Sequence, residues 1–230
     1  MRLLRDFIEL FFPRVCCVCG TPLVGDEHDI CTRCLLELPE AYTATGSDSM
    51  LERRLRGRVP IRKASALLYY KQGTGAQTIL HQIKYYGNER LAITMGRQMG
   101  ITLMNSGLFD DVDIIVPVPL HRSKERKRGY NQSLLLCQGI AQRFPRPIST
   151  GNLVRIKKTD TQTKKNREER LDNMRGVFAV TNPEAFIGKH ILLVDDVITT
   201  GATTEACYEA MKHIEGISFS IATLAVSGDN

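Results

Sequence analysis

The strongest constraint on the fold is a stretch in which four apolar residues are followed by two carboxylates and a threonine-rich turn. Residues 191–194, Ile-Leu-Leu-Val, carry no polar side chain, as is typical of a strand buried on both faces of a parallel sheet. A helix is predicted to begin at Ala202, because apolar residues recur beyond it at helical spacing. A buried strand that turns directly into a helix is the building unit of an α/β fold.

The chain from residue 61 onward repeats this alternation of strands and helices. Strands are expected at residues 64–70, 113–118 and 217–227, and helices at residues 75–86, 89–104 and 131–144. Elements that alternate at this length favour an α/β fold in which a mostly parallel, twisted sheet has helices on both faces.

The turn after residue 194 has the chemistry of a site for a phosphorylated ribose. Ligands of open α/β sheets lie beyond the carboxyl ends of the strands, and backbone N–H groups at a helix N-terminus form a nest for a phosphate. Two adjacent carboxylates would repel that phosphate, so we expect them to bind a vicinal diol or a metal ion. The residues concerned are Asp195, Asp196, Thr199, Thr200, Gly201, Ala202 and Thr203.

A plain helix cap and the common nucleotide-binding loops fit this turn less well. A cap would use Thr199 or Thr200 and would need neither the paired aspartates nor Gly201. The chain has no Gly-x4-Gly-Lys-Ser/Thr pattern for a nucleoside triphosphate, and no Gly-x-Gly-x-x-Gly after a strand for a dinucleotide.

A cluster of cations follows the strand expected at residues 113–118. Five of the seven residues at 122–128 are Lys or Arg. We expect this segment to be a loop, and we expect it to lie at the same edge of the sheet as the paired aspartates. Such a loop would neutralise a pyrophosphate, whereas the alternative is a solvated basic loop without a ligand. The candidate residues are His121, Arg122, Lys124, Arg126, Lys127 and Arg128.

Four cysteines near the N-terminus have the spacing of a zinc site. Cys16 and Cys19 form one Cys-x2-Cys pair, and Cys31 and Cys34 form a second after eleven intervening residues. Four protein ligands indicate a structural zinc ion. Free thiols or a redox pair are the alternatives. Nearby, Cys17 is a spare thiol that could replace one ligand, and His28 is the next candidate for the fourth position.

The residues 191–203, ILLVDDVITTGAT, resemble the signature of type I phosphoribosyltransferases, enzymes that use 5-phosphoribosyl 1-pyrophosphate (PRPP) with Mg²⁺. The resemblance implies that the two acids bind the ribose 2′- and 3′-hydroxyls, that the turn binds the 5′-phosphate and that the basic segment binds pyrophosphate. It also implies a catalytic lid in the polar segment after residue 152, which we expect to be a mobile loop. Its candidate residues are Arg155, Lys158, Gln162 and Arg167.

The chain as a whole resembles the ComF/GntX family. The resemblance rests on the four-cysteine motif ahead of such a domain, on VPVPLHRSKERKRGYNQS and on R-x3-T-x2-Q. That family is associated with natural competence, which implies a role in uptake of single-stranded DNA, with DNA and a competence helicase as partners. An active transferase is the alternative. Its acceptor would be a nitrogen nucleophile, as in an amidophosphoribosyltransferase or in purine or pyrimidine salvage. A vestigial phosphate site in an interaction protein is the third hypothesis.

Composition divides the chain into three regions but says little about its ligand. We expect an N-terminal helix and zinc ribbon in residues 1–45, a linker or solvated helix in 46–60 and a phosphoribosyltransferase-like domain in 61–230. The net charge of +6 suits an acidic partner but does not separate pyrophosphate from DNA.

The aromatic pairs Tyr69-Tyr70 and Tyr85-Tyr86 are expected to span core and surface. No apolar stretch is long enough to span a bilayer, and we expect a cytoplasmic protein; the oligomeric state is left open.

Overall fold

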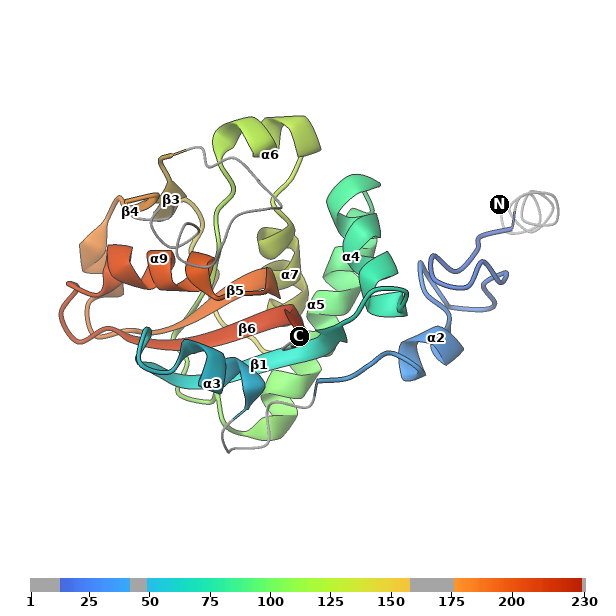
Figure 1. Cartoon of the computed structure of the whole chain (residues 1–230), viewed down its shortest axis with the longest axis horizontal. Coiled ribbons are helices and arrows are strands. Elements are labelled where there is room, and N and C mark those ends of the chain that lie inside the picture. The colour runs from blue at the N-terminus through green and yellow to red at the C-terminus, as the bar shows by residue number, and fades with distance from the viewer. Residues whose placement is uncertain (1–12, 42–48, 158–175, 229–230) are drawn as a thin grey trace.

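A sheet of four parallel strands forms the centre of the molecule, a computed structural model that describes residues 13–41, 49–157 and 176–228 (Figure 1). The strand order is β1-β6-β5-β2. The strands are β1 (Ile61–Tyr70), β2 (Ile114–Pro117), β5 (His190–Ile198) and β6 (Ser218–Ser227). Because β5 pairs with β2 on one side and with β6 on the other, the strand with the two aspartates is central. The predicted parallel sheet is confirmed.

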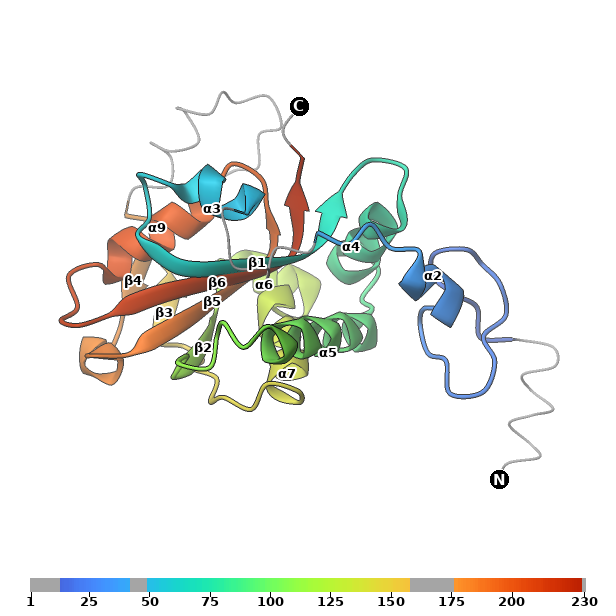
Figure 2. The same cartoon turned by 90° about the horizontal axis from the view of Figure 1, so that it is seen from below.

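Helices cover both faces of this sheet, as Figure 2 shows in an edge-on view. On one face lie α4 (Gly75–Tyr85), α5 (Glu89–Ser106) and α7 (Gln132–Ala141). The backbones of α5 and α7 approach closely at glycines: a Cβ placed on Gly96 would lie 2.3 Å from the Leu136 carbonyl oxygen. The other face is covered by α9 (Ala202–Met211) and by α3 (Met50–Leu55). The helices predicted at residues 75–86, 89–104, 131–144 and from residue 202 are present, with ends that differ by a few residues.

The segment that was expected to be a linker or a solvated helix packs against the sheet. It contains α3, which begins at a capping box in which Ser49 and Glu52 each bond the other's backbone N–H. Leu51 and Leu55 of this helix are completely buried, and they share a hydrophobic cluster with Ala64 of β1. A helix is therefore present, but the expectation that it is solvated was wrong.

Two expected loops contain regular structure. The basic segment forms a short helix, α6 (Arg122–Arg128), because His121 accepts from the Ser123 N–H at its start and Gly129, with φ 91°, ends it. The polar segment after residue 152 begins with β3 (Leu153–Arg155), which pairs antiparallel with β4 (Phe178–Val180). A 3-10 turn, Pro183–Phe186, then leads to β5.

The four-cysteine segment, described from residue 13 to residue 41, contains the short helix α2 (Thr32–Leu36) and packs at the end of the sheet next to α4. Arg90 of α5 donates to both carboxylate oxygens of Asp29, at 2.7 and 3.1 Å. A Cβ on Gly75 would touch Val18 and Leu38 at 3.1–3.2 Å, which shows how closely the two parts approach. The expected N-terminal helix lies outside the described residues, and none of the described helices is long and apolar enough to cross a membrane.

Candidate functional site

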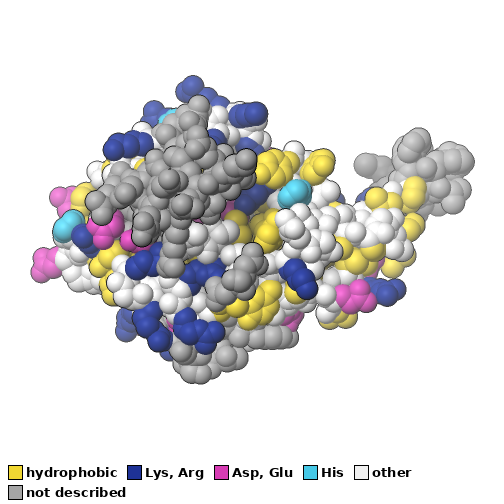
Figure 3. All heavy atoms as spheres, in the orientation of Figure 1, with side chains coloured by type: hydrophobic (Ala, Val, Ile, Leu, Met, Phe, Trp, Pro, Cys, Tyr) yellow, Lys and Arg dark blue, Asp and Glu magenta, His cyan; other side chains and the backbone are white. Residues whose placement is uncertain are grey.

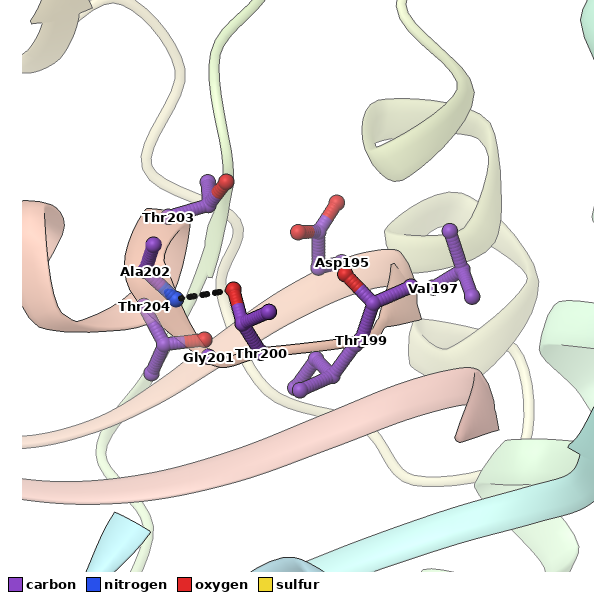
Figure 4. A pocket seen from close by; sticks show the side chains of 9 residues that line it. Asp195, Val197, Thr199, Thr200, Gly201, Ala202, Thr203 and Thr204 are labelled. Atoms are coloured by element: carbon purple, nitrogen blue, oxygen red, sulfur yellow. Dashed lines mark hydrogen bonds between the residues drawn. The ribbon is translucent and has the colours of Figure 1, made fainter. Parts of the chain in front are cut away.

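The central strand β5 carries both aspartates to the carboxyl edge of the sheet. It is longer than predicted and includes Asp195 and Asp196 in its final residues. A tight turn then leads into α9, with Gly201 at φ 81° as the residue that precedes the helix. Asp195 and the turn line a pocket with about 220 Å³ of empty space, whose lining does not include Asp196 (Figure 4). Its lining is Asp195, Val197, Ile198, Thr199, Thr200, Gly201, Ala202, Thr203 and Thr204.

The N-terminus of α9 opens into this pocket and has backbone donors to offer. Among the described residues no side chain caps it from the Gly201 position, although the Thr200 hydroxyl lies 3.4 Å from the Ala202 N–H. The first-turn N–H groups of Thr203 and Thr204 have no acceptor within the described part of the chain. Uncapped N–H groups at a helix N-terminus favour an anion, and the predicted turn residues line one continuous concavity beside them.

The two aspartates are held in different ways. Asp195 accepts from the Ser133 hydroxyl of α7 at 3.3 Å and from the Asp196 N–H at 2.8 Å. Asp196 forms an ion pair with Lys84 of α4, with 3.3 Å between Nζ and Oδ2. Lys84 and Ser133 were not singled out from the sequence. Two helices from the opposite face of the sheet therefore fix the carboxylates.

Burial shapes the electrostatics of the pair. It raises the pKa of Asp195 from 3.8 to about 7, and the neighbouring negative charge of Asp196 acts in the same direction. Lys84 and the hydrogen bonds from Ser133 and the Asp196 N–H oppose this shift. A carboxyl group that titrates near neutrality can accept from ligand hydroxyls when it is ionised.

The predicted pyrophosphate residues lie on α6, directly after β2. None of this helix is buried, and Lys and Arg side chains gather over it on the face shown in Figure 3. The Nδ1 atom of His121 is 2.8 Å from the Ser123 hydroxyl and accepts from the Ser123 N–H, so His121 serves as a helix cap. The guanidinium of Arg128 lies over the Tyr85 ring, 5.9 Å from its centroid. Arg122, Arg126 and Lys127 are therefore exposed cations on a capped helix, while Lys124 and Arg128 are half-buried.

Of the predicted lid residues, the structure describes Arg155 alone. It lies at the end of β3, over the Phe178 ring at 5.4 Å, and burial lowers its pKa while the nearby Asp195 charge opposes that change. Arg155 therefore lies within the electrostatic reach of Asp195. Lys158, Gln162 and Arg167 lie outside the described residues.

The four cysteines of the predicted zinc site come together. The Sγ atoms of Cys16, Cys19, Cys31 and Cys34 all lie within 4.8 Å of one another. Two thiolates bound to one zinc ion in a tetrahedral site are about 3.8 Å apart, and the Cys19 and Cys31 Sγ atoms are separated by 3.8 Å. The set fits the sulfur ligands that zinc prefers.

The two alternative ligands are directed elsewhere. Cys17 is half-buried and packs against the main core. His28 is exposed, and its Nδ1 atom lies 3.0 Å from the Arg14 guanidinium. Neither belongs to the cluster of Sγ atoms.

Comparison with known proteins agrees with this arrangement. Residues 131–229 match the Phosphoribosyl transferase domain family. The chain is 28% identical to DNA utilization protein YhgH of Salmonella typhi over 84% of this chain and 88% of that protein. It is 28% identical to Competence protein ComFC of Bacillus subtilis over 86% and 72% of the two chains. Competence protein F of Haemophilus influenzae is 36% identical over 44% of this chain and 45% of its own length.

The chain is therefore similar to proteins of the ComF family over most of its length. Its fold is the type I phosphoribosyltransferase fold, preceded by a four-cysteine segment that is consistent with a zinc ribbon. The matched domain begins only at residue 131. Two elements that contact the turn or the aspartates, α3 and α4, therefore lie ahead of it.

Proposed function

We propose that this protein binds PRPP together with Mg²⁺ at the carboxyl edge of the sheet. The observation that carries the proposal is a pocket in which Asp195 lies beside an uncapped helix N-terminus, with Asp196 next to it on β5. This pocket suits a ligand with hydroxyls at one end and a phosphate dianion at the other. A 5-phosphorylated ribose has both.

Each end of the ligand is assigned to different atoms. The 5′-phosphate accepts from the backbone N–H groups and hydroxyls of the 199–203 turn. Asp195 and Asp196 accept from the ribose hydroxyls, and the cations of α6 neutralise the pyrophosphate. Mg²⁺, when bound, would take oxygen ligands from PRPP and a carboxylate of the aspartate pair, and would offset the charge of the pyrophosphate.

Titration calorimetry with three ligands tests the assignment. With Mg²⁺ present, we expect PRPP to bind more tightly than ribose 5-phosphate or pyrophosphate alone, since it joins both sets of contacts. Ribose 5-phosphate should compete with PRPP. If none of the three ligands gives heat, or if pyrophosphate alone binds as tightly as PRPP, the proposed ligand is wrong.

Catalytic transfer of the phosphoribosyl group is a further step of this proposal. The pocket would fix the anomeric carbon, and Arg155, with lid residues such as Lys158, would offset charge as the bond to pyrophosphate breaks. A nitrogen nucleophile would then form the new bond. Pyrophosphate release with a panel of bases and amines measures turnover; release with none of them favours a binding role.

We also propose contact with single-stranded DNA, in line with the relatives named for DNA utilization and competence. A specific surface supports it. Tyr85 and Tyr86 are 70% and 72% exposed, unlike the half-buried Tyr69 and Tyr70, so only the latter pair spans core and surface. The exposed pair lies beside the cations of α6, and hydrophobic side chains gather over α4 in Figure 3. Exposed aromatic rings next to cations are typical of single-strand binding surfaces.

Binding of two oligonucleotides of equal length separates stacking from phosphate attraction. One strand consists of thymidines, and the other has the same phosphates but no bases. We expect Tyr85→Ala to weaken binding of the thymidine strand about tenfold, the effect of losing one stacked base, and to leave the abasic strand unaffected. Met104→Ala, at another exposed apolar residue, is the control. Equal anisotropy changes with both strands, or none at low salt, would contradict the proposal. A helicase partner is compatible with either outcome and needs a separate pull-down.

The four-cysteine segment is proposed to hold one structural Zn²⁺ ion. All four ligands would be cysteines, which leaves no open position for catalysis. Metal analysis should give one zinc per chain, and Cys34→Ser should lose it; well under one zinc per chain refutes the site. All seven cysteines are free, which fits the cytoplasmic location that we propose.

A further inference from the structure

The side of the 199–203 turn that faces away from the pocket is held by Arg54 of α3 and by Arg58, which follows this helix; both lie ahead of the matched domain. The Arg54 Nη1 atom donates to the carbonyl oxygens of Thr199 at 2.6 Å and Ile198 at 3.4 Å. Its Nη2 atom donates to the Ser227 carbonyl oxygen at 2.8 Å. One guanidinium therefore ties the end of β5 to the end of β6.

Arg58 holds the next peptide in the same way. Its Nη2 atom donates to the Thr200 carbonyl oxygen at 2.9 Å, and its Nη1 atom forms an ion pair with Glu205 of α9 at 3.1 Å. The two side chains of this ion pair are only 17% and 26% exposed. Nη2 also donates to the Arg54 carbonyl oxygen, so the two arginines form one unit.

This arrangement fixes the direction of the peptide groups in the turn. In a peptide unit the C=O and N–H bonds point in opposite directions, so carbonyl oxygens that face α3 direct the following N–H groups toward the pocket. Two guanidinium groups behind the turn also add positive charge near a bound anion, which Glu205 offsets in part. Both effects favour a phosphate dianion.

Packing holds α3 in position for this contact. Leu55 is completely buried and lies against Gly201, where an added Cβ would be 2.6 Å from its Cδ2 atom. The carboxylate of Glu52 accepts from the Ala64 N–H of β1 at 3.3 Å. Arg54 therefore lies on a helix that is fixed to the sheet and Arg58 directly follows it, so little order has to be gained when a ligand binds.

We propose that Arg54 and Arg58 are positioning residues for phosphate binding and that α3 is an integral part of the phosphate site. This inference rests on the proposed function, since it assigns a role at the same pocket. It extends the site to residues 49–58, which lie outside the matched domain. The arginines act through the backbone of the turn and do not touch the ligand.

The test compares Arg54→Met and Arg58→Met with Arg53→Met, which changes an exposed arginine of α3. We expect each of the first two changes to lower the affinity for ribose 5-phosphate about tenfold or more, the effect of losing charged hydrogen bonds. Arg53→Met should leave it unchanged, and Arg58→Lys should restore part of it. Affinity for pyrophosphate, which α6 would bind, should not change. Equal losses for both ligands, or none, overturn the inference.

Amide hydrogen exchange in the ligand-free protein provides a readout that does not depend on the ligand. Exchange at residues 199–204 should become faster in Arg54→Met and Arg58→Met, without a matching change in α7, and should stay unchanged in Arg53→Met. Unaltered exchange in the turn overturns the positioning role. If the turn loosens as expected but wild-type protein binds no phosphorylated ribose, the proposed function fails and the positioning role stands.

Discussion

The turn after β5 and the helix after β2 leave the same edge of the sheet, yet they are built differently. The 199–203 turn is held from behind by Arg54 and Arg58 and presents backbone N–H groups to the pocket. The cations of α6 are side chains on a helix with no buried residue. The first region is fixed before a ligand arrives, whereas the second supplies charge from side chains at the surface.

This difference assigns the two regions different tasks in binding a phosphorylated ligand. A fixed set of N–H groups selects by shape, and changes in it should have large effects that depend little on salt. Exposed cations select by charge, and their effects should be small, additive and screened by salt. Four sets of substitutions test this division, from the largest expected effect to the smallest.

Removing both negative charges from the aspartate pair should have the largest effect. Asp195→Asn with Asp196→Asn replaces acceptors of ribose hydroxyls by neutral amides, and the pair's ion pair with Lys84 is lost. We expect PRPP affinity to fall about 100-fold, because charged hydrogen bonds contribute about 1.5–3 kcal/mol each. Calorimetry measures it, with Asp110→Asn on an exposed residue as the control. An unchanged affinity would place the ribose elsewhere.

A side chain at Gly201 should disturb the turn through its contact with α3. Gly201→Ala combines a φ of 81° with a Cβ that would lie 2.6 Å from Leu55, so we expect a loss of about 2–4 kcal/mol in the free energy of unfolding. Gly107→Ala has φ 63° but nothing within 4 Å of the added Cβ, so it should cost only about 1–2 kcal/mol. Urea unfolding compares the two. Equal losses would show that α3 does not constrain the turn.

The raised pKa of Asp195 predicts a pH-dependent stability. Its pKa is 3.8 in the reference state and about 7 in the folded protein, so the folded state binds more protons between these values and stability falls as pH rises through that window. Asp195→Asn cannot ionise. Relative to wild type, it should be more stable by at least about 1 kcal/mol at pH 8 and should lose this advantage by pH 4. Urea unfolding without Mg²⁺ measures it; a pH-independent difference would contradict the buried carboxyl.

Single cations of α6 should have the smallest effect. Arg126→Gln removes one exposed charge from the last turn of the helix, so we expect PRPP affinity to fall about twofold to fivefold at low salt. The difference should shrink when the ionic strength is raised to about 0.5 M. Calorimetry at two salt concentrations measures it. A large loss that persists at high salt would make α6 a fixed part of the site and remove the contrast with the turn.

The sequence predicted the parts of the site that are close together in the chain. The aspartates, the threonine turn and the cysteine pairs are local patterns, and the structure brings each set together. Arg54 and Arg58 were missed because they reach carbonyls more than 140 positions away, and backbone acceptors leave no trace in a sequence. In contrast, α6 could have been found from the Glu125 in its first turn and the Gly129 that ends it.

The exposed tyrosines show another limit of local patterns. Tyr69-Tyr70 and Tyr85-Tyr86 are identical pairs, but the first lies in β1 beside β6 and the second at the end of α4. Neighbouring elements of the sheet cover part of each ring in the first pair, whereas a helix that ends at the surface leaves both rings exposed. Tertiary position, which the pairs themselves do not encode, decides the difference.

The most direct test of the central claim is a crystal structure of the protein with Mg²⁺ and PRPP. We predict that the 5′-phosphate lies against the N–H groups of residues 199–203, with the ribose hydroxyls at Asp195 and Asp196 and the pyrophosphate toward α6. Arg54 and Arg58 should keep their contacts with the carbonyl oxygens behind the turn. A ligand bound with its pyrophosphate in the turn, or at another part of the molecule, would contradict the claim.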